Sequence, residues 1–269
     1  MNGWRLELRQ APPLRVDLRG IVPSALAGLS VREIEQRRVG HGNTTVPLAE
    51  FFRVAESPDD GLRFAGDLVR FDRVGWQMAG GTIVVEGDVG HYAGAAMSGG
   101  ELRVHGSAGL HAACEMAGGL LSIAGNVGDF AAGTLPGSMD GMRGGTLLVK
   151  GRAGARFGDR MRRGNALVFG DVGEFAGSRM VAGTVAIGGR AGAHAGYAMR
   201  RGSLVFAGPA PTVSPTFVPA IAAADVIWQL LARDLARHGG VFAELRRRRI
   251  ERHLGDLAAD GKGELIFAS

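Results

Sequence analysis

The stretch from Met78 to Ala96 reads MAGGTIVVEGDVGHYAGAA, and the chain repeats its pattern at once. Residues Met97 to Glu115 read MSGGELRVHGSAGLHAACE, and Met116 to Phe130 read MAGGLLSIAGNVGDF. Each copy opens on methionine, a small residue and two glycines, and then enters a short run rich in aliphatic residues. A fixed period near 20 residues predicts a solenoid, in which each copy of the repeat is one structural unit.

The period extends well beyond these three copies. The methionines that open the repeats are separated by 19, 19, 26, 19, 19 and 19 residues, and they are Met78, Met97, Met116, Met142, Met161, Met180 and Met199. A single seven-residue insertion, within Ala131–Gly141, therefore interrupts the register. Three columns of glycine, led by Gly81, Gly87 and Gly90, and a mixed Gly/Ala column led by Gly94 keep the same period. We expect the glycines at corners that need a positive φ or a close backbone approach.

The residues between the first two glycine columns predict the type of solenoid. Apolar residues alternate there, as in Ile83/Val85 and Leu102/Val104, which is the period of a strand with one buried face. No repeat has room for a ten-residue helix. The sequence therefore predicts a mainly β protein, a right-handed parallel β-helix of about seven 19-residue coils. The methionine column is expected inside it as flexible core filler. A left-handed β-helix acyltransferase would need 18-residue coils, built from a hexapeptide period, and does not match.

The flanking segments depart from the repeat. We expect residues 1–60 to form an N-terminal cap, residues 61–208 the β-helix, and residues 209–269 a C-terminal linker, helix and tail. A short helix is predicted near Ser30–Arg37. A second, amphipathic helix is predicted within Ala220–Gly240, and its apolar face would carry Ile227, Leu230, Leu231 and Leu235.

Composition narrows the class of protein. The single cysteine, Cys114, excludes a disulfide framework within the chain and any site built from cysteines alone. No apolar run is long enough to span a membrane, and the N-terminus lacks the apolar core of a signal peptide. A cytoplasmic location is the expectation.

Candidate catalytic residues are few. The seven histidines form no H-x-H or H-E-x-x-H motif, so no metal site is predicted. We expect His91, His111 and His194 to be solvated corner residues and Cys114 to be an ordinary apolar residue. No catalytic and no metal-binding residue is therefore assigned, and the sequence predicts a scaffold without activity of its own.

The Gly-x2-Gly-x3-Gly corners and the seven methionine-headed copies resemble the GXGXG β-helix domain. That domain occurs at the C-terminus of the glutamate synthase large subunit and as the C subunit of formylmethanofuran dehydrogenase. The ending HLGDLAADGKGELIF, His253–Phe267, is similar to that C-subunit family. This resemblance covers nearly the whole chain and implies a scaffold subunit of a one-carbon complex.

Two settings are implied by the resemblance. The first is the bacterial formyltransferase/hydrolase complex, which moves formyl groups from formyl-tetrahydromethanopterin to a methanofuran-type carrier and releases formate. Its other subunits would be a formyltransferase, an amidohydrolase-like chain and a third subunit. The second is the archaeal molybdenum or tungsten formylmethanofuran dehydrogenase. An Ala-rich composition in which Arg replaces Lys favours the bacterial setting.

Arginines gather beside the methionines of the later repeats. The set singled out as a candidate binding surface is Arg143, Arg162, Arg163, Arg200 and Arg201. In a parallel stack these arginines would form a basic ladder, interrupted by Val181 and Ala182. The resemblance supplies an anion, the glutamyl-rich tail of the carrier, and an acidic partner face would serve equally. A solvated face with ordinary salt bridges is the alternative.

A nucleic-acid-binding β-solenoid is the rival of another class. It would rest on an isoelectric point of about 10.2 and on the run Arg246–Arg249. Aromatic residues make up only 6% of the chain and none is expected to interleave the arginine columns, so no base-stacking surface is predicted. Neither nucleic acid nor membrane is therefore an expected partner.

Overall fold

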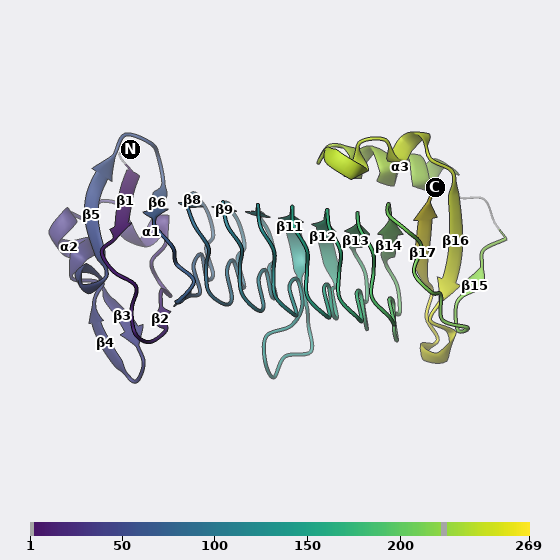
Figure 1. Ribbon diagram of the computed structural model, residues 1–269, viewed down its shortest axis with the longest axis horizontal. Helices are drawn as coiled ribbons and strands as arrows, with labels where there is room; N and C mark the ends of the chain where they lie inside the picture. Colours follow the sequence, from purple (N-terminus) through teal and green to yellow (C-terminus); the bar gives the residue numbers. More distant parts are fainter. Residues whose placement is uncertain (1–2, 222–224) are drawn as a thin grey trace.

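The computed structural model describes residues 3–221 and 225–269. Figure 1 shows an elongated molecule with one terminus at each end and a long stack of short strands between them. The strands form a 13-stranded sheet in the order β15-β16-β17-β14-β13-β12-β11-β10-β9-β8-β6-β1-β5, and a second sheet has the order β4-β3-β2-β7. The protein is therefore mainly β, with most of its sheet parallel.

The N-terminal end consists of short helices and strands that cover the first strand of the stack. β1 pairs antiparallel with β5 and parallel with β6. Ser30 caps α2 through a capping box with Glu33, which confirms the short helix expected there. The elements are β1 (Gly3–Leu8), β2 (Val16–Asp17), α1 (Pro23–Leu26), α2 (Val31–Glu35), β3 (Arg38–His41), β4 (Thr44–Pro47), the 3-10 turn η1 (Leu48–Glu50), β5 (Phe52–Ser57), β6 (Leu62–Ala65) and β7 (Phe71–Asp72).

The central strands pair in parallel, each with the same position of the next repeat except at the start of β11, where Arg143 is opposite Arg163. Thr82 is opposite Glu101, for example, and Glu101 is opposite Leu120. The seven-residue insertion leaves this register intact, because Leu120 is opposite Thr146 on its far side. These strands are β8 (Thr82–Val85), β9 (Glu101–Val104), β10 (Leu120–Ile123), β11 (Arg143–Val149), β12 (Arg163–Val168), β13 (Thr184–Ile187) and β14 (Ser203–Phe206).

The core runs through the middle of the stack as columns of identical or similar residues. All seven repeat-opening methionines are fully buried, as expected from the sequence. Alternate strand residues, such as Ile83 and Val85, are buried with them. The bridge column that begins Leu68, Val89 and Ala108 forms the other inner wall through isolated parallel bridges. The unbranched thioether fills the corner between these walls with little strain.

The glycine columns are required by contacts between successive repeats. Gly164 has φ +89°, and a Cβ there would lie 2.6 Å from the carbonyl oxygen of Gly145. Gly183 has φ +95°, and its Cβ would lie 2.9 Å from the carbonyl oxygen of Gly164. Any side chain would thus meet the backbone of the preceding repeat.

Side chains also tie one repeat to the next. The carboxylate of Asp72 accepts the amide of His91 at 2.7 Å, and the His91 Nδ1 accepts the amide of Leu110 at 3.0 Å. Asp129 then accepts the amide of Ala155 at 2.7 Å. In this column, side-chain acceptors therefore form hydrogen bonds with corner backbone N–H groups that are not paired within a strand.

The C-terminal segment closes the other end of the stack and returns over it. β14 pairs in parallel with β17, and β16 pairs antiparallel with β17. The buried Asp256 accepts the amides of Ala198 and Ala258, which ties the ending of the chain to the last repeat. The elements are β15 (Val218–Pro219), α3 (Asp225–Ala236), the turns η2 (Gly240–Phe242) and η3 (Leu245–Arg247), β16 (Ile250–Gly255), the turn η4 (Leu257–Ala259) and β17 (Gly263–Ala268).

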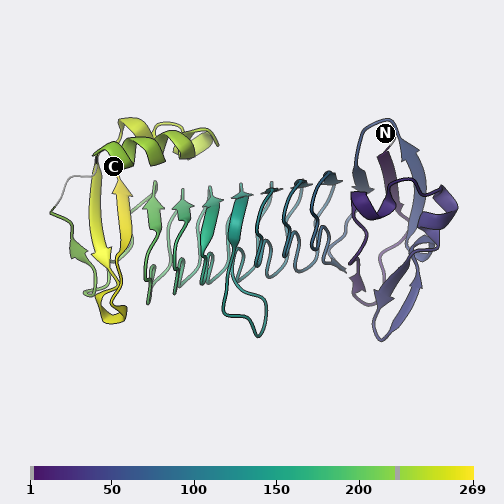
Figure 2. The ribbon, with the colours of Figure 1, turned by 180° about the vertical axis from the view of Figure 1, so that it is seen from behind.

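Helix α3 lies over the outer face of the later strands, as Figure 2 shows from behind. Its buried residues are Trp228, Ala232 and Leu235, which pack with Leu167 and Val205 of the sheet. The predicted apolar face was therefore partly wrong, because Ile227 and Leu230 are 63% and 55% exposed. The broad indole of Trp228 orients the helix instead. The part of the predicted helix at positions 222–224 lies outside the described residues.

We predict that Gly164→Val and Gly183→Val each destabilise the fold by about 1–3 kcal/mol or more, because a β-branched residue is strained at positive φ. Ala79→Val is the control, since Ala79 is exposed on the same corner. Chemical unfolding of the three variants measures the difference. Equal midpoints for all three would show that the corners tolerate side chains.

We also predict that stability falls as the pH is lowered from about 7.5 to about 5.5. Burial, with Arg15 nearby, lowers the pKa of His91 below its ordinary value, and burial lowers the pKa of His111 and His238 in the same direction. The unfolded chain then takes up protons first, so the stabilisation is complete above about pH 6.5 and is lost below it.

His91→Asn tests this directly, because an amide oxygen still accepts the Leu110 N–H but does not titrate. Its melting temperature should fall less over the same pH range than that of the wild type. Identical pH profiles for the two proteins would contradict the role given to His91.

Candidate functional site: an arginine groove beside the methionine column

The five arginines singled out from the sequence lie around one hollow. Each follows a buried methionine by one or two residues, so the methionine holds the backbone at the corner while the arginine extends outward. All five side chains are exposed. Together with Val181 and Ala182 they line a groove of about 640 Å³, which we call the arginine groove. The structure thus brings together residues that are up to 58 positions apart, from Arg143 to Arg201.

A second hollow, of about 390 Å³, continues the arginine groove around the corner. The two share Arg162, Val181 and Arg200. The second adds Arg160 and Arg179, while Met139 and Ala259 close it. These two additional arginines are visible in the sequence but stand outside the candidate set, because nothing in the spacing shows that the insertion and the C-terminal turn enclose them.

Charge compensation divides the arginines of the groove into two groups. Asp140 of the insertion forms a close ion pair with Arg162, and Glu115 lies 3.5 Å from the Arg143 guanidinium. Among residues 3–221 and 225–269 no ion pair is formed by Arg163, Arg200 or Arg201. The five arginines thus lie together, and two of them, Arg143 and Arg162, have acidic partners in Glu115 and in Asp140 of the insertion.

Asp159 is a buried carboxylate that pairs with the arginines beside the second hollow. Its side chain is almost fully buried, accepts a hydrogen bond from the Ser178 hydroxyl, and pairs with Arg179 at 2.8 Å. Arg156 and Arg160 each lie 3.9 Å from the same carboxylate. One buried charge thus faces three guanidinium groups, and it fixes Arg179 while the cluster stays cationic overall. Asp159 was not expected from the sequence, because its position before Arg160 suggests a solvated corner.

A stacked column runs along the adjacent corner. Tyr92 stacks on His111 at 5.0 Å and His111 on Phe130 at 5.2 Å. Arg156 then lies over both Phe130 and Phe175, at 5.8 and 4.8 Å. This is a separate column beside the arginine groove, which is lined by arginines, Val181 and Ala182, as expected for the arginine columns. The repeat period could have revealed this column in the sequence. Its members are Arg73, Tyr92, His111, Phe130, Arg156, Phe175 and His194, all with φ between 58° and 63°.

This column is a structural element. Its ring faces contact one another, and such pairs contribute about 0.5–1.5 kcal/mol each. The faces are therefore occupied by neighbours within the chain rather than offered to a ligand. His111 is half-buried, which corrects its assignment as a solvated corner residue, and the same holds for His91, whereas His194 is exposed as expected.

Cys114 is a buried residue, as expected. Its Sγ donates to the carbonyl oxygens of Phe130 and Thr134 at 3.2 and 3.3 Å. Burial raises the pKa of the thiol well above its ordinary value, so the reactive thiolate is disfavoured. His111 Nδ1 is 3.5 Å from this sulfur and 3.2 Å from the Thr134 carbonyl oxygen, so both side chains anchor the start of the insertion.

Across the described residues no group of three or more His, Cys, Asp or Glu side chains is placed to hold a metal ion. Within the same part of the chain, no helix has the length and apolar character that crossing a membrane requires.

No protein-family model matches the sequence. Several curated relatives each match part of it. The C subunit of the formyltransferase/hydrolase complex of Methylorubrum extorquens is 44% identical over 85 residues, which is 32% of this chain and 32% of the relative. The C subunit of the tungsten-containing formylmethanofuran dehydrogenase 2 of Methanothermobacter wolfeii is 35% identical over 92 residues, 32% of this chain and 34% of the relative. The chain thus spans about a third of the length of each of these two relatives.

A solved structure matches almost the entire chain. It is a chain of the X-ray crystal structure of the formyltransferase/hydrolase complex (FhcABCD) from Methylorubrum extorquens in complex with methylofuran. The TM-score is 0.93 and the sequence identity 42%, and the match covers 98% of this chain and 99% of that chain. The fold, the repeats and this similarity over the full length agree: the chain belongs to the C-subunit family of formylmethanofuran dehydrogenase, which includes the C subunit of the formyltransferase/hydrolase complex.

Proposed function

We propose that the chain is the scaffold subunit of a cytoplasmic formyltransferase/hydrolase complex. That complex would move formyl groups between tetrahydromethanopterin and a methanofuran-type carrier and release formate. Its partners would be a formyltransferase subunit, an amidohydrolase-like subunit and a third subunit. The chain itself would bind no cofactor alone and catalyse no step.

The observation that carries this proposal is the match to the FhcABCD chain, at 42% identity over 98% of this sequence. The alternative, the C subunit of a molybdenum or tungsten formylmethanofuran dehydrogenase, has lower support. A tungsten-enzyme relative is 35% identical and a molybdenum-enzyme relative 41% identical over the matched stretches, against 44% for the formyltransferase/hydrolase relative. The partial sequence match and the full-length structural match therefore both favour the formyltransferase/hydrolase complex.

We further propose that the stack is a right-handed parallel β-helix of about seven 19-residue coils, built on the GXGXG motif. The parallel pairing of β8 to β14 supports this, in a register that is constant apart from one shift between Arg143 and Thr146 of β11. A rod in which each repeat contacts only its neighbours presents long, rigid faces. Such faces suit a subunit whose role is to hold others in place.

The arginine groove is the proposed contact for the anionic tail of the carrier or for an acidic partner face. Arg163, Arg200 and Arg201 carry the unpaired charge, while Asp140 and Glu115 partly neutralise Arg162 and Arg143. Guanidinium groups pair well with carboxylates. The nucleic-acid alternative is disfavoured, because the aromatic faces of the neighbouring column already stack on one another.

One co-purification experiment tests both parts of this proposal. When the tagged chain is produced in its native host and purified, a formyltransferase, an amidohydrolase-like chain and a third subunit should co-purify with it. Since an exposed ion pair is worth up to about 1 kcal/mol, Arg200→Glu with Arg201→Glu should lower carrier content or assembly by about tenfold or more.

The matched control is Arg53→Glu with Arg190→Glu, which changes the charge equally at two exposed sites outside the arginine groove. A wild-type chain that elutes alone would refute the scaffold role. Equal carrier content, assembly and activity in both double variants would refute the role of the groove only.

A further inference from the structure

The outer face of α3 is apolar although nothing in the described structure covers it. Val226, Ile227 and Leu230 are 74%, 63% and 55% exposed, and they occupy two adjacent turns. The opposite face is also apolar and packs on the sheet through Trp228, Ala232 and Leu235. A helix that is apolar on both sides is normally enclosed on both sides.

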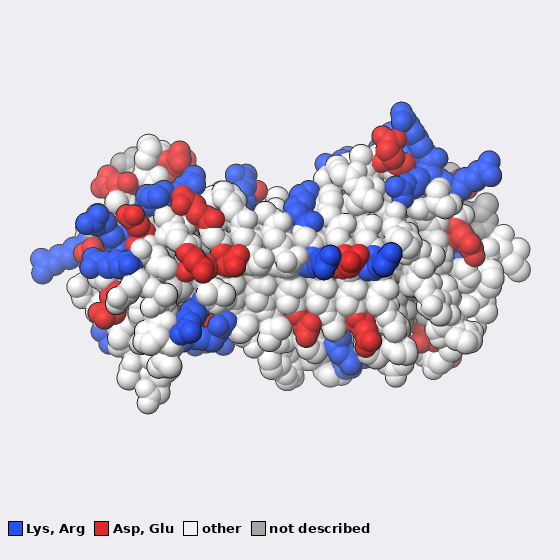
Figure 3. Space-filling model, viewed as in Figure 1, with Lys and Arg blue, Asp and Glu red and all other residues white. Residues whose placement is uncertain are grey.

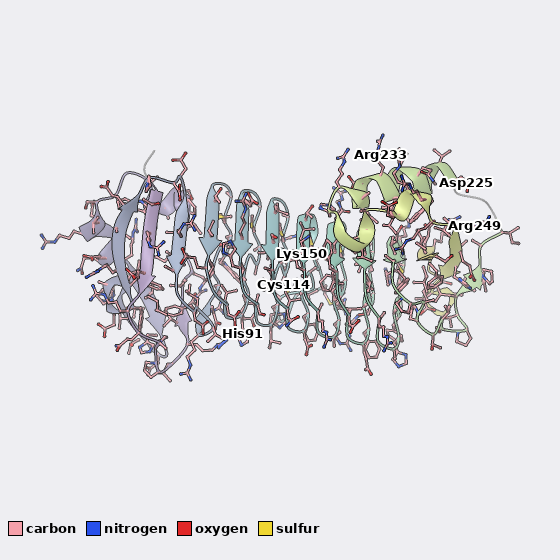
Figure 4. The ribbon with its side chains drawn as sticks, turned by 45° about the horizontal axis from the view of Figure 1, so that its top comes forward. His91, Cys114, Lys150, Asp225, Arg233 and Arg249 are labelled. Carbon is pink, nitrogen blue, oxygen red and sulfur yellow. The ribbon has the colours of Figure 1, made fainter. Side chains whose placement is uncertain are left out.

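Charge gathers around this apolar face. Arg233 lies on the next turn of α3, and Figure 4 shows it pointing away from the sheet. Arg246 lies beside the helix, because its carbonyl oxygen accepts the side-chain amide of Gln229 at 3.2 Å. Neither guanidinium forms an ion pair within residues 3–221 and 225–269, whereas Arg237 and Arg247 are paired with Asp234 and Glu244. Figure 3 shows the basic side chains clustered over this end of the molecule.

We propose that Val226, Ile227 and Leu230, bordered by Arg233 and Arg246, form a docking surface for another protein subunit. This inference rests on the proposed role as a scaffold. The occupant it requires is a segment with apolar side chains at its centre and carboxylates at its edge. An apolar centre with a charged rim is the usual anatomy of a protein interface, and the two unpaired cations select an acidic rim on the partner.

A membrane surface fits less well. An interfacial helix buries one broad apolar face in the lipid, but the broader apolar face of α3 already packs on the sheet. The three remaining side chains sit within the first half of the helix. A protein partner can enclose such a small patch on all sides, which a lipid surface does not.

Co-purification of the assembled complex tests the surface. Val226→Ser with Leu230→Ser should reduce the recovered partner subunits by about tenfold, equivalent to 1.4 kcal/mol. Leu14→Ser is the matched control, since Leu14 is 55% exposed like Leu230 but lies at the other end of the molecule. It should leave recovery unchanged. Arg233→Glu with Arg246→Glu should make the complex dissociate at lower salt.

Circular dichroism and melting temperature establish that each variant folds. Full recovery of every subunit by the folded Val226/Leu230 variant would overturn the inference while leaving the scaffold role intact. A wild-type chain that recovers no partner would overturn both. Binding of the isolated wild-type chain to phosphatidylglycerol vesicles, or self-association measured by light scattering, would also overturn it if the Val226/Leu230 variant abolished that behaviour.

Discussion

The contact between a corner glycine and the carbonyl of the repeat before it is the constraint on which the fold depends. At Gly145, Gly164 and Gly183 a Cβ would lie 2.7, 2.6 and 2.9 Å from that carbonyl oxygen. The repeats can approach at strand spacing only because these positions have no side chain. A one-residue shift of register at Gly164 or Gly183 would replace the glycine by a residue with a side chain. The seven-residue insertion within Ala131–Gly141 is tolerated because the chain returns to register before Gly145, which still meets the carbonyl oxygen of Gly119.

The same register brings together the arginines of the proposed binding groove. Because each repeat presents the same positions at the same corner, arginines that are 19 or 38 residues apart become neighbours. The insertion adds what the register alone does not supply. Met139 and Asp140 return to the corner, where the sulfur of Met139 lies 3.3 Å from the Arg160 guanidinium and Asp140 neutralises Arg162. The unpaired charge is thereby concentrated at Arg163, Arg200 and Arg201.

The repeat could be predicted from the sequence because its physical causes are local. Periodic glycines indicate corners, and periodic methionines indicate a buried column. The strands, the buried methionines and the grouping of the arginines could therefore be predicted from the spacing. Asp159 could not be predicted, because its burial depends on three arginines and a serine that surround it in space. The orientation of α3 could not be predicted either, since both of its faces are apolar and only the packing of Trp228 decides between them.

The proposed role of the arginine groove requires that its arginines bind carboxylates. Titration of the purified chain with an oligoglutamate peptide, monitored by calorimetry at low salt and at about 0.3 M salt, tests it directly. We predict saturable binding that weakens with salt, strengthens in Asp140→Asn, and is lost in Arg200→Glu with Arg201→Glu. Binding that the double variant retains unchanged, or no binding by the wild type at low salt, would contradict this role.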